Sequence, residues 1–166
     1  AEGGVISGEQ FVDECQVESD LELLLPATYV TGSSERMLLY RELDSLTLDK
    51  DVEAFRNRLV DRFGPVPSET EELLRIVPLR RLAARLGTEK VFLKGGRMSL
   101  FFISNPESPY YQSQAFGKVI AYMMKYTRRC DLREQNTRRS MLVKDVKNVE
   151  TAVGVLQEIV AMQVEE

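Results

Sequence analysis

The spacing of apolar residues changes near Glu89, and this change restricts what the chain can fold into. Before Glu89 the apolar residues recur at helical spacing, and after it they alternate with polar residues, as they do in strands. A chain that separates helices from hairpins in this way is typical of α+β domains. We therefore predict N-terminal helices followed by two ββα units, which form a mainly antiparallel sheet covered by helices.

Length and composition are sufficient for one domain with its own core. At 166 residues and 43% hydrophobic content, the chain can bury that core without metal ions or disulfides. No apolar run approaches the ~18 residues that would suggest a membrane span. Only Cys15 and Cys130 are present, and no secretory signal precedes them. We expect reduced thiols in a cytoplasmic protein, with a disulfide between the two as the alternative.

Three helices are predicted before the change of spacing, after a short edge strand over residues 11–17. Each is expected to begin at side chains that can cap it: Ser33 or Ser34, then Asp49, then Ser68 with Glu71 in a capping box. The third helix ends at Gly87. We expect it to kink or break near Val77, because Pro78 has no backbone N–H to donate.

Two hairpins are predicted after Glu89, with turns at Gly95–Gly96 and Asn136–Thr137. Pro109 is expected to open the helix after the first hairpin, and Asn148 to cap the helix after the second. The run Lys94-Gly95-Gly96-Arg97 has the composition of a phosphate loop but lacks its spacing. Its place between two strands predicts a turn instead.

The second helix contains the most informative segment, FRNRLVDRFGPVP. Val52, Phe55, Leu59 and Phe63 fall on one face and form an apolar stripe toward the core. Gly64, just after them, is suited to a left-handed cap at the end of the helix.

The opposite face of this helix carries Asn57, Arg58 and Asp61, which helical phase directs to the surface. A carboxylate in the last turn opposes the helix macrodipole at a cost of ~0.3–1 kcal/mol, so Asp61 is expected there for a pairing. One alternative is a local ion pair of Asp61 with Arg58 or Arg62. The other is a contact with a partner protein.

Charge is distributed unevenly along the chain, whose net charge is −4. Residues 1–75 hold 17 acidic and 7 basic residues, whereas residues 118–147 hold 9 basic and 3 acidic ones. This polarity fits a domain that docks on a charged protein surface at least as well as one that follows phosphates.

Catalytic chemistry has little support in the sequence. There is no histidine, which removes the commonest general base and the commonest metal ligand. The acidic residues at the starts of the second and third helices complement the macrodipole and lack a converging ligand ring. We therefore assign no catalytic residue, no cofactor-binding residue and no metal ligand.

Four tyrosines lie among basic residues and have the composition of a stacking platform for single strands: Tyr110, Tyr111, Tyr122 and Tyr126. Aromatic residues at helical spacing are more often part of a core, and we predict that role for them.

Four segments in this order carry a resemblance: LLLPATYV (23–30), SERMLLYREL (34–43), RLVDRFGPVP (58–67) and LRRLAARLG (79–87). Together they resemble the C-terminal domain of the bacterial transcription-repair coupling factors, the Mfd family. The resemblance extends from about Phe11 to Val160. The ordered set is specific, whereas any one segment alone would be weak.

The resemblance implies that residues 11–166 are a single C-terminal regulatory domain and that residues 1–10 are a linker or the tail of an upstream motor region. The parent protein would be a DNA translocase with ATP and magnesium in its motor. It would remove RNA polymerase stalled at DNA damage and recruit UvrA for nucleotide excision repair. The terminal domain would dock on the UvrB-like N-terminal module, mask the UvrA-binding surface and so autoinhibit the protein.

The family's DRFG motif falls on residues 61–64, so the resemblance implies a protein interface formed by Asn57, Arg58, Asp61 and Arg62. The implied domain has no cofactor of its own, no membrane contact, and DNA contact only through other domains. Two positions depart from the family pattern. Arg58 replaces an acidic residue, and Pro78 interrupts a helix expected to be continuous.

A second function remains open from the residues themselves. The basic segment 118–147 could form a nucleic-acid-binding module, with affinity that falls as salt rises. The first hypothesis places the functional surface on the second helix, and the second places it near the C-terminus.

Overall fold

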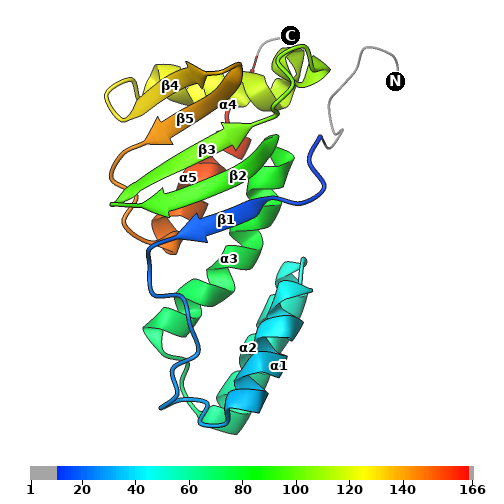
Figure 1. Ribbon diagram of the computed structural model, residues 1–166, viewed down its shortest axis with the longest axis vertical. Coiled ribbons are helices and arrows are strands. Elements are labelled where there is room, and N and C mark those ends of the chain that lie inside the picture. Colours follow the sequence, from blue (N-terminus) through cyan, green and yellow to red (C-terminus); the bar gives the residue numbers. More distant parts are fainter. Residues whose placement is uncertain (1–10, 165–166) are drawn as a thin grey trace.

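The computed structural model describes residues 11–164. Helices pack against one face of a sheet, and a helical hairpin lies beyond one edge of that sheet (Figure 1). The predicted linker, residues 1–10, lies outside the described residues. In chain order the elements are β1 (Gln16–Ser19), α1 (Ser33–Asp44), α2 (Asp49–Phe63), α3 (Ser68–Arg85), β2 (Thr88–Lys94), β3 (Arg97–Phe102), the 3-10 helix η1 (Pro109–Gln112), α4 (Gln114–Lys125), β4 (Cys130–Gln135), β5 (Arg138–Val143) and α5 (Val149–Val160).

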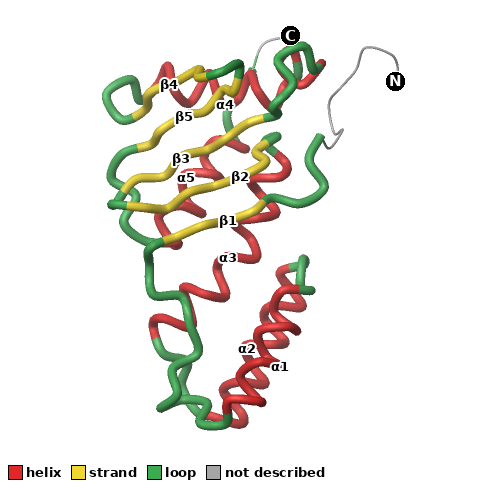
Figure 2. The backbone as a smooth tube through the Cα atoms, in the orientation of Figure 1, coloured by secondary structure: helices red, strands yellow, loops and turns green. Residues whose placement is uncertain are grey.

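The sheet has five strands in the order β1-β2-β3-β5-β4. Only β1 runs parallel to its neighbour, and the three other pairs are antiparallel. Figure 2 shows the strands gathered in one sheet and the helices outside it, which confirms the predicted α+β class. The predicted edge strand is displaced, because β1 begins at Gln16 instead of near Phe11. Val12 and Cys15 are buried although neither is part of a strand.

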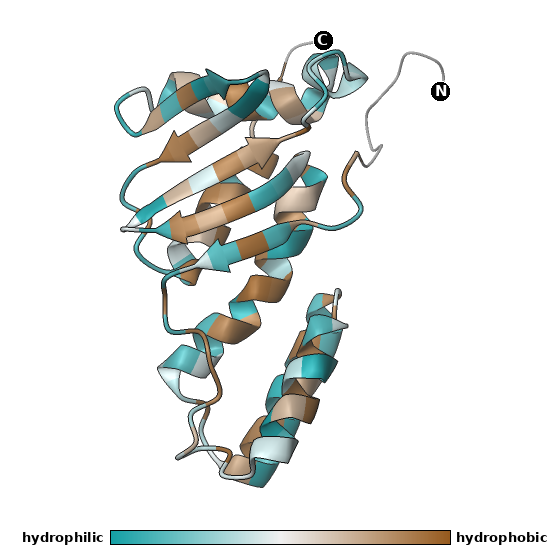
Figure 3. Cartoon of the chain, viewed as in Figure 1, coloured by the Kyte–Doolittle hydropathy of each residue, from teal (hydrophilic) through white to brown (hydrophobic). Residues whose placement is uncertain are grey.

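Two apolar clusters form the interior. The larger one lies between the sheet and helices α3, α4 and α5, and the smaller one lies among α1, α2 and the first half of α3. Helix α3 contributes Leu74 and Val77 to the smaller cluster, and Leu79 and Leu82 to the larger one. Figure 3 shows the apolar stripes of these helices as brown bands between hydrophilic turns.

Helix α3 passes through Pro78 as one helix, so the predicted interruption near Val77 is absent. Proline removes one hydrogen bond, to the carbonyl of Leu74 one turn earlier. The residues on both sides of Pro78 are buried in the two clusters, and this packing outweighs the loss of a single backbone bond.

The two hairpin turns are as predicted. Gly95 and Gly96 have φ of +63° and +74°, and Asn136 and Thr137 have φ of +54° and +65°. Positive φ at both central residues matches the twist of the flanking strands. The Lys94 to Arg97 run is therefore a turn between β2 and β3.

Side-chain capping was predicted correctly only at α5, where Asn148 Oδ1 accepts a hydrogen bond from the backbone N of Thr151 at 2.7 Å. The N-caps of the first three helices are Gly32, Leu48 and Pro67, and none of them forms a side-chain cap. The serines and the aspartate expected there lie one residue further, inside the first turn. The predicted capping box is wrong because Glu71 binds Arg56 of α2 instead.

The helix expected after Pro109 is divided. Pro109 opens only the short η1, with Ser108 as its cap, and Ser113 then caps α4. Tyr110 of η1 is fully buried, and its hydroxyl donates to the carbonyl of Leu86. The predicted core role is confirmed for Tyr110 and also for Tyr122, which is likewise fully buried, while the other two tyrosines are half-buried.

Both cysteines are free and buried, as expected for reduced thiols. Burial raises the pKa of the Cys15 thiol to about 12. Among the described residues, no helix has the length and apolar character to cross a membrane.

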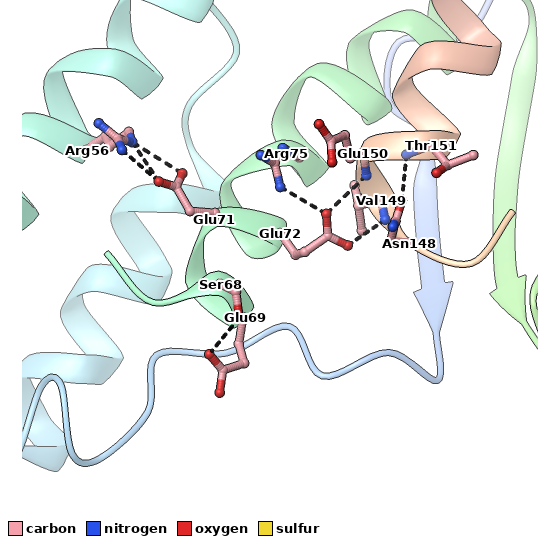
Figure 4. Close-up of polar contacts among 10 residues, drawn as sticks. All are labelled: Arg56, Ser68, Glu69, Glu71, Glu72, Arg75, Asn148, Val149, Glu150 and Thr151. Atoms are coloured by element: carbon pink, nitrogen blue, oxygen red, sulfur yellow. Dashed lines mark hydrogen bonds and ion pairs between the residues drawn. The ribbon is translucent and has the colours of Figure 1, made fainter. Parts of the chain in front are cut away.

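Glu72 of α3 holds the start of α5 (Figure 4). Its carboxylate accepts hydrogen bonds from the backbone N of Val149 at 2.6 Å and of Glu150 at 3.1 Å. Arg75 lies 3.0 Å from the same carboxylate. A negative group at this position accepts hydrogen bonds from two backbone N–H groups of α5 and interacts favourably with the positive end of its macrodipole. Glu72 therefore couples α3 to the last helix.

We predict that Glu72→Ala lowers the free energy of unfolding by about 1–2 kcal/mol, because it leaves two backbone donors of α5 without a partner. Arg75→Ala is the matched control. It removes the ion pair but keeps the cap, and should cost less than about 1 kcal/mol. Denaturant unfolding of both variants measures the difference, and equal costs would show that the cap contributes nothing.

Candidate docking surface on the helical hairpin

Helix α2 presents to the core the stripe that its sequence predicts. Phe55 and Leu59 are buried, and Val52 and Phe63 are half-buried against the smaller cluster. Gly64 ends the helix with φ +91° and ψ −166°. Its φ is positive as expected, but its ψ is far from left-handed helical values, so the predicted cap geometry is wrong. This conformation is open to glycine and strained for other residues.

An ion pair fixes α2 against α3. The Arg56 Nε donates to Glu71 Oε1 at 3.2 Å and a terminal nitrogen donates to Oε2 at 2.7 Å, a bidentate contact that Figure 4 shows between the two helices. A bidentate guanidinium contact restrains orientation as well as distance. The rotation of α2 about its own axis is thereby restrained.

Two further ion pairs fix α2 against α1. Arg58 binds Glu42 and Arg62 binds Glu35. The guanidinium carbons of these arginines also lie over the Phe55 ring at 5.4 Å and the Phe63 ring at 4.9 Å from its centroid. The alternative of a local pair with Asp61 is therefore wrong, because both candidate arginines bind α1.

Asp61 and Asn57 remain exposed on the outer face of α2. Neither side chain has a hydrogen bond or ion pair with any residue in the described range 11–164. The structure thus divides the four predicted interface residues into two kinds. Arg58 and Arg62 stabilise the hairpin, whereas Asn57 and Asp61 are free to contact a partner.

Sequence reasoning missed two exposed apolar residues on α1. Met37 and Leu38 have 59% and 63% of their surface accessible. Leu38 precedes Glu42 by one turn, so it lies on the α1 surface beside the Glu42–Arg58 pair. The run MLL at residues 37–39 contained the signal, since three consecutive apolar residues cannot all face one core. The outer surface of the hairpin therefore combines a free carboxylate with apolar area.

The basic segment 118–147 does not form one surface. It extends over α4, β4 and β5, and several of its cations already have partners in the chain. Lys118 donates to the Val160 carbonyl, Lys125 pairs with Glu158, and Arg129 donates to the Lys144 carbonyl. This segment is therefore poorly suited, as a whole, to follow a phosphate backbone.

Residues 11–164 contain no group of three or more histidine, cysteine, aspartate or glutamate side chains that could hold a metal ion. Three of the acidic residues at the starts of α2 and α3 form structural contacts. Asp49 pairs with Arg81 at 3.0 Å, in addition to the contacts of Glu71 and Glu72 described above.

Comparison with known proteins gives one consistent result. The family model named TRCF domain matches residues 19–113. The transcription-repair-coupling factor of Rickettsia bellii is 29% identical over 132 residues, which cover 79% of this chain. That of Staphylococcus haemolyticus is 24% identical over 131 residues, which cover 75%. In both cases the match covers 11% of the relative, so the chain spans about a ninth of their length.

A solved structure has the same fold. The crystal structure of a C-terminal domain of transcription-repair coupling factor superimposes with a TM-score of 0.67 at 16% sequence identity. The match covers 89% of this chain and 93% of that one.

We predict that a double-mutant cycle of Arg58→Ala with Glu42→Ala gives a coupling energy of about 0.2–1 kcal/mol in unfolding. The cycle of Arg58→Ala with Asp61→Ala serves as its control and should give no measurable coupling. A larger coupling with Asp61 than with Glu42 would contradict the assignment of Arg58 to α1.

Proposed function

This chain belongs to the TRCF-domain family of transcription-repair-coupling factors, and from that premise we propose that it is an autoinhibitory domain. It docks on the UvrB-like N-terminal module of its parent protein and masks the surface that binds UvrA. The outer face of α2, with Asn57 and Asp61 at its centre, is the contact. Met37 and Leu38 of α1 add apolar area at its border.

The observation that carries this proposal is the free carboxylate of Asp61. An unpaired aspartate in the last turn of a helix is unfavourable for the isolated domain. The two nearby arginines, Arg58 one turn before it and Arg62 next to it, bind glutamates of α1 instead. A basic group on a partner would compensate that cost. The three ion pairs that fix α2 keep the surface rigid, which reduces the entropy lost on docking.

Docking within one polypeptide needs little intrinsic affinity. A tether raises the effective concentration of the two surfaces to the millimolar range for short flexible linkers, so a weak interface keeps most molecules closed. A ligand that binds only the open form then shifts the population, and its differential affinity sets the extent of the shift. Opening would expose the masked UvrA site and release the motor.

The domain itself is proposed to be non-catalytic and to bind no cofactor. The absence of histidine from the sequence supports this. The ATP and magnesium sites and the duplex-DNA contacts of the parent translocase would belong to other domains, and RNA polymerase would be an indirect partner. The parent protein would act in the cytoplasm during repair of damaged, transcribed DNA.

We predict that Asp61→Arg weakens binding of this chain to the isolated UvrB-like module by on the order of 2–5 kcal/mol, since the change removes one attraction and adds a repulsion. In the full-length protein the same change should raise UvrA binding. Because the side chain is exposed, the free energy of unfolding should change by less than about 0.5 kcal/mol. Calorimetric titration and a thermal melt measure the two effects.

Glu107→Arg is the matched control, because it makes the same change of charge in the exposed loop between β3 and η1. It should leave docking unchanged. Equal weakening by both variants would show that the effect comes from the net charge of the chain and not from a contact at position 61. Unchanged docking in a normally folded Asp61→Arg variant would refute this face as the inhibitory contact.

A further inference from the structure

The sheet has one face that no described element covers. Helices α3, α4 and α5 all lie on the same side of it, and Figure 1 shows the strands unobstructed on the other. The alternation along the strands agrees. In β3, Met98 and Leu100 are buried toward the helices, while Ser99 and Phe101, which alternate with them, are half-buried on the uncovered side.

Two aromatic rings and several cations occupy the middle of this face. Phe92 of β2 and Phe101 of β3 lie edge to face, with ring centroids 5.4 Å apart. The Lys94 Nζ lies 5.0 Å from the Phe92 centroid, and the guanidinium carbon of Arg138 lies 5.6 Å from that of Phe101. A half-buried ring bordered by cations is the pattern of surfaces that stack a base and hold its phosphate.

Beside Phe101 the face is hollowed over β3, β5 and β4. The hollow has a volume of about 470 Å³, within the range of ligand sites, and its lining is Ser99, Phe101, Arg133, Gln135, Asn136, Arg138, Ser140 and Leu142. This lining has two arginines and no acidic residue. The remaining polar groups are hydroxyls and amides, which can donate and accept hydrogen bonds.

The two arginines can form further hydrogen bonds and ion pairs. Arg133 has 60% of its side chain exposed, and its nearest carboxylate oxygen, on Asp131, is 3.9 Å away. Arg138 reaches Glu89 through a terminal nitrogen at 3.1 Å, but its buried Nε has no hydrogen-bond partner in the described residues. A buried donor without a partner is energetically costly, and a ligand that accepts a hydrogen bond from this nitrogen would explain its presence.

We propose that this hollow binds single-stranded nucleic acid. One base lies against Phe101, its edge meets the hydroxyl and amide groups, and the adjoining phosphates contact Arg133 and Arg138. The acidic side chains of this face include Glu18 and Asp131 on the two outermost strands, and Glu89 of β2, which pairs with Arg138. Arg138 is thus partly neutralised and Arg133 supplies most of the positive charge. The lining of the hollow has no acidic residue, so its charge matches a phosphate locally although the whole chain is acidic.

The chemistry distinguishes a single strand from the other anionic partners. A duplex hides the faces of its bases and would contact only the arginines. An acidic peptide would pair with the arginines but would offer the Phe101 ring no planar group. The site is separate from the α2 surface, so it neither requires nor replaces the docking proposed above.

Fluorescence anisotropy with a labelled oligothymidylate of about 15 nucleotides tests the proposal. We expect binding at low salt, with a preference over the corresponding duplex. Phe101→Leu keeps apolar packing but removes the ring plane, and should weaken binding at least fivefold or so. Arg133→Gln should lower the slope of log K against log salt by about 0.7, the value for one phosphate contact on a single strand.

Arg128→Gln is the matched control, because Arg128 is exposed in the turn before β4, within the same basic segment but outside the hollow. It should leave the salt slope unchanged. Absence of binding at low salt would overturn the proposal, and so would equal effects of Arg128→Gln and Arg133→Gln. Tighter binding of polyglutamate with the same sensitivity to Arg133→Gln would assign the hollow to an acidic protein segment instead.

Discussion

The fold depends on α3 being shared by two apolar clusters. Its first half packs against the hairpin of α1 and α2, and its second half packs under the sheet. Adjacent side chains on this helix, about 100° apart, hold partners on different sides. Glu71 binds Arg56 of α2, and Glu72 caps α5. A helix that ended at Pro78 would separate these contacts, so the continuity of α3 sets the position of the hairpin relative to the sheet.

This arrangement leaves two surfaces with different chemistry. The hairpin presents a free carboxylate and exposed aliphatic side chains, which suit a protein with a basic patch. The uncovered sheet face presents a half-buried ring and arginines, which suit an anion with a planar group. Neither surface contains the paired acid and base that general acid–base catalysis requires. Both proposals are therefore binding functions, and each can fail without the other.

Features set by local sequence were predictable. The hairpin turns, the cap at Asn148 and the outward direction of Asp61 follow from turn chemistry and helical phase. Features set by distant residues were not. Arg58 and Arg62 bind α1 instead of Asp61, and Glu71 binds α2 instead of capping its own helix. The helix continues through Pro78 because residues on both sides of it pack into the two clusters, and the local sequence does not show that packing.

The uncovered sheet face was beyond sequence reasoning for a further reason. Phe101 and Arg138 are far apart in the chain and meet only because β3 pairs with β5. The sequence pointed to basic residues 118–147 as one unit, whereas strand register separates them onto different sides. Only Arg133 and Arg138 among them reach the hollow. Candidate sites assembled by sheet pairing need the register before their residues can be grouped.

The central claim is that the outer face of α2 contacts the UvrB-like module, and site-specific photo-crosslinking tests it most directly. A photoreactive residue at position 57 leaves Asp61 and the three ion pairs of α2 intact. If this face is the contact, position 57 crosslinks to the module and position 107 in the distant loop does not. A crosslink from position 107 with none from position 57 would contradict it.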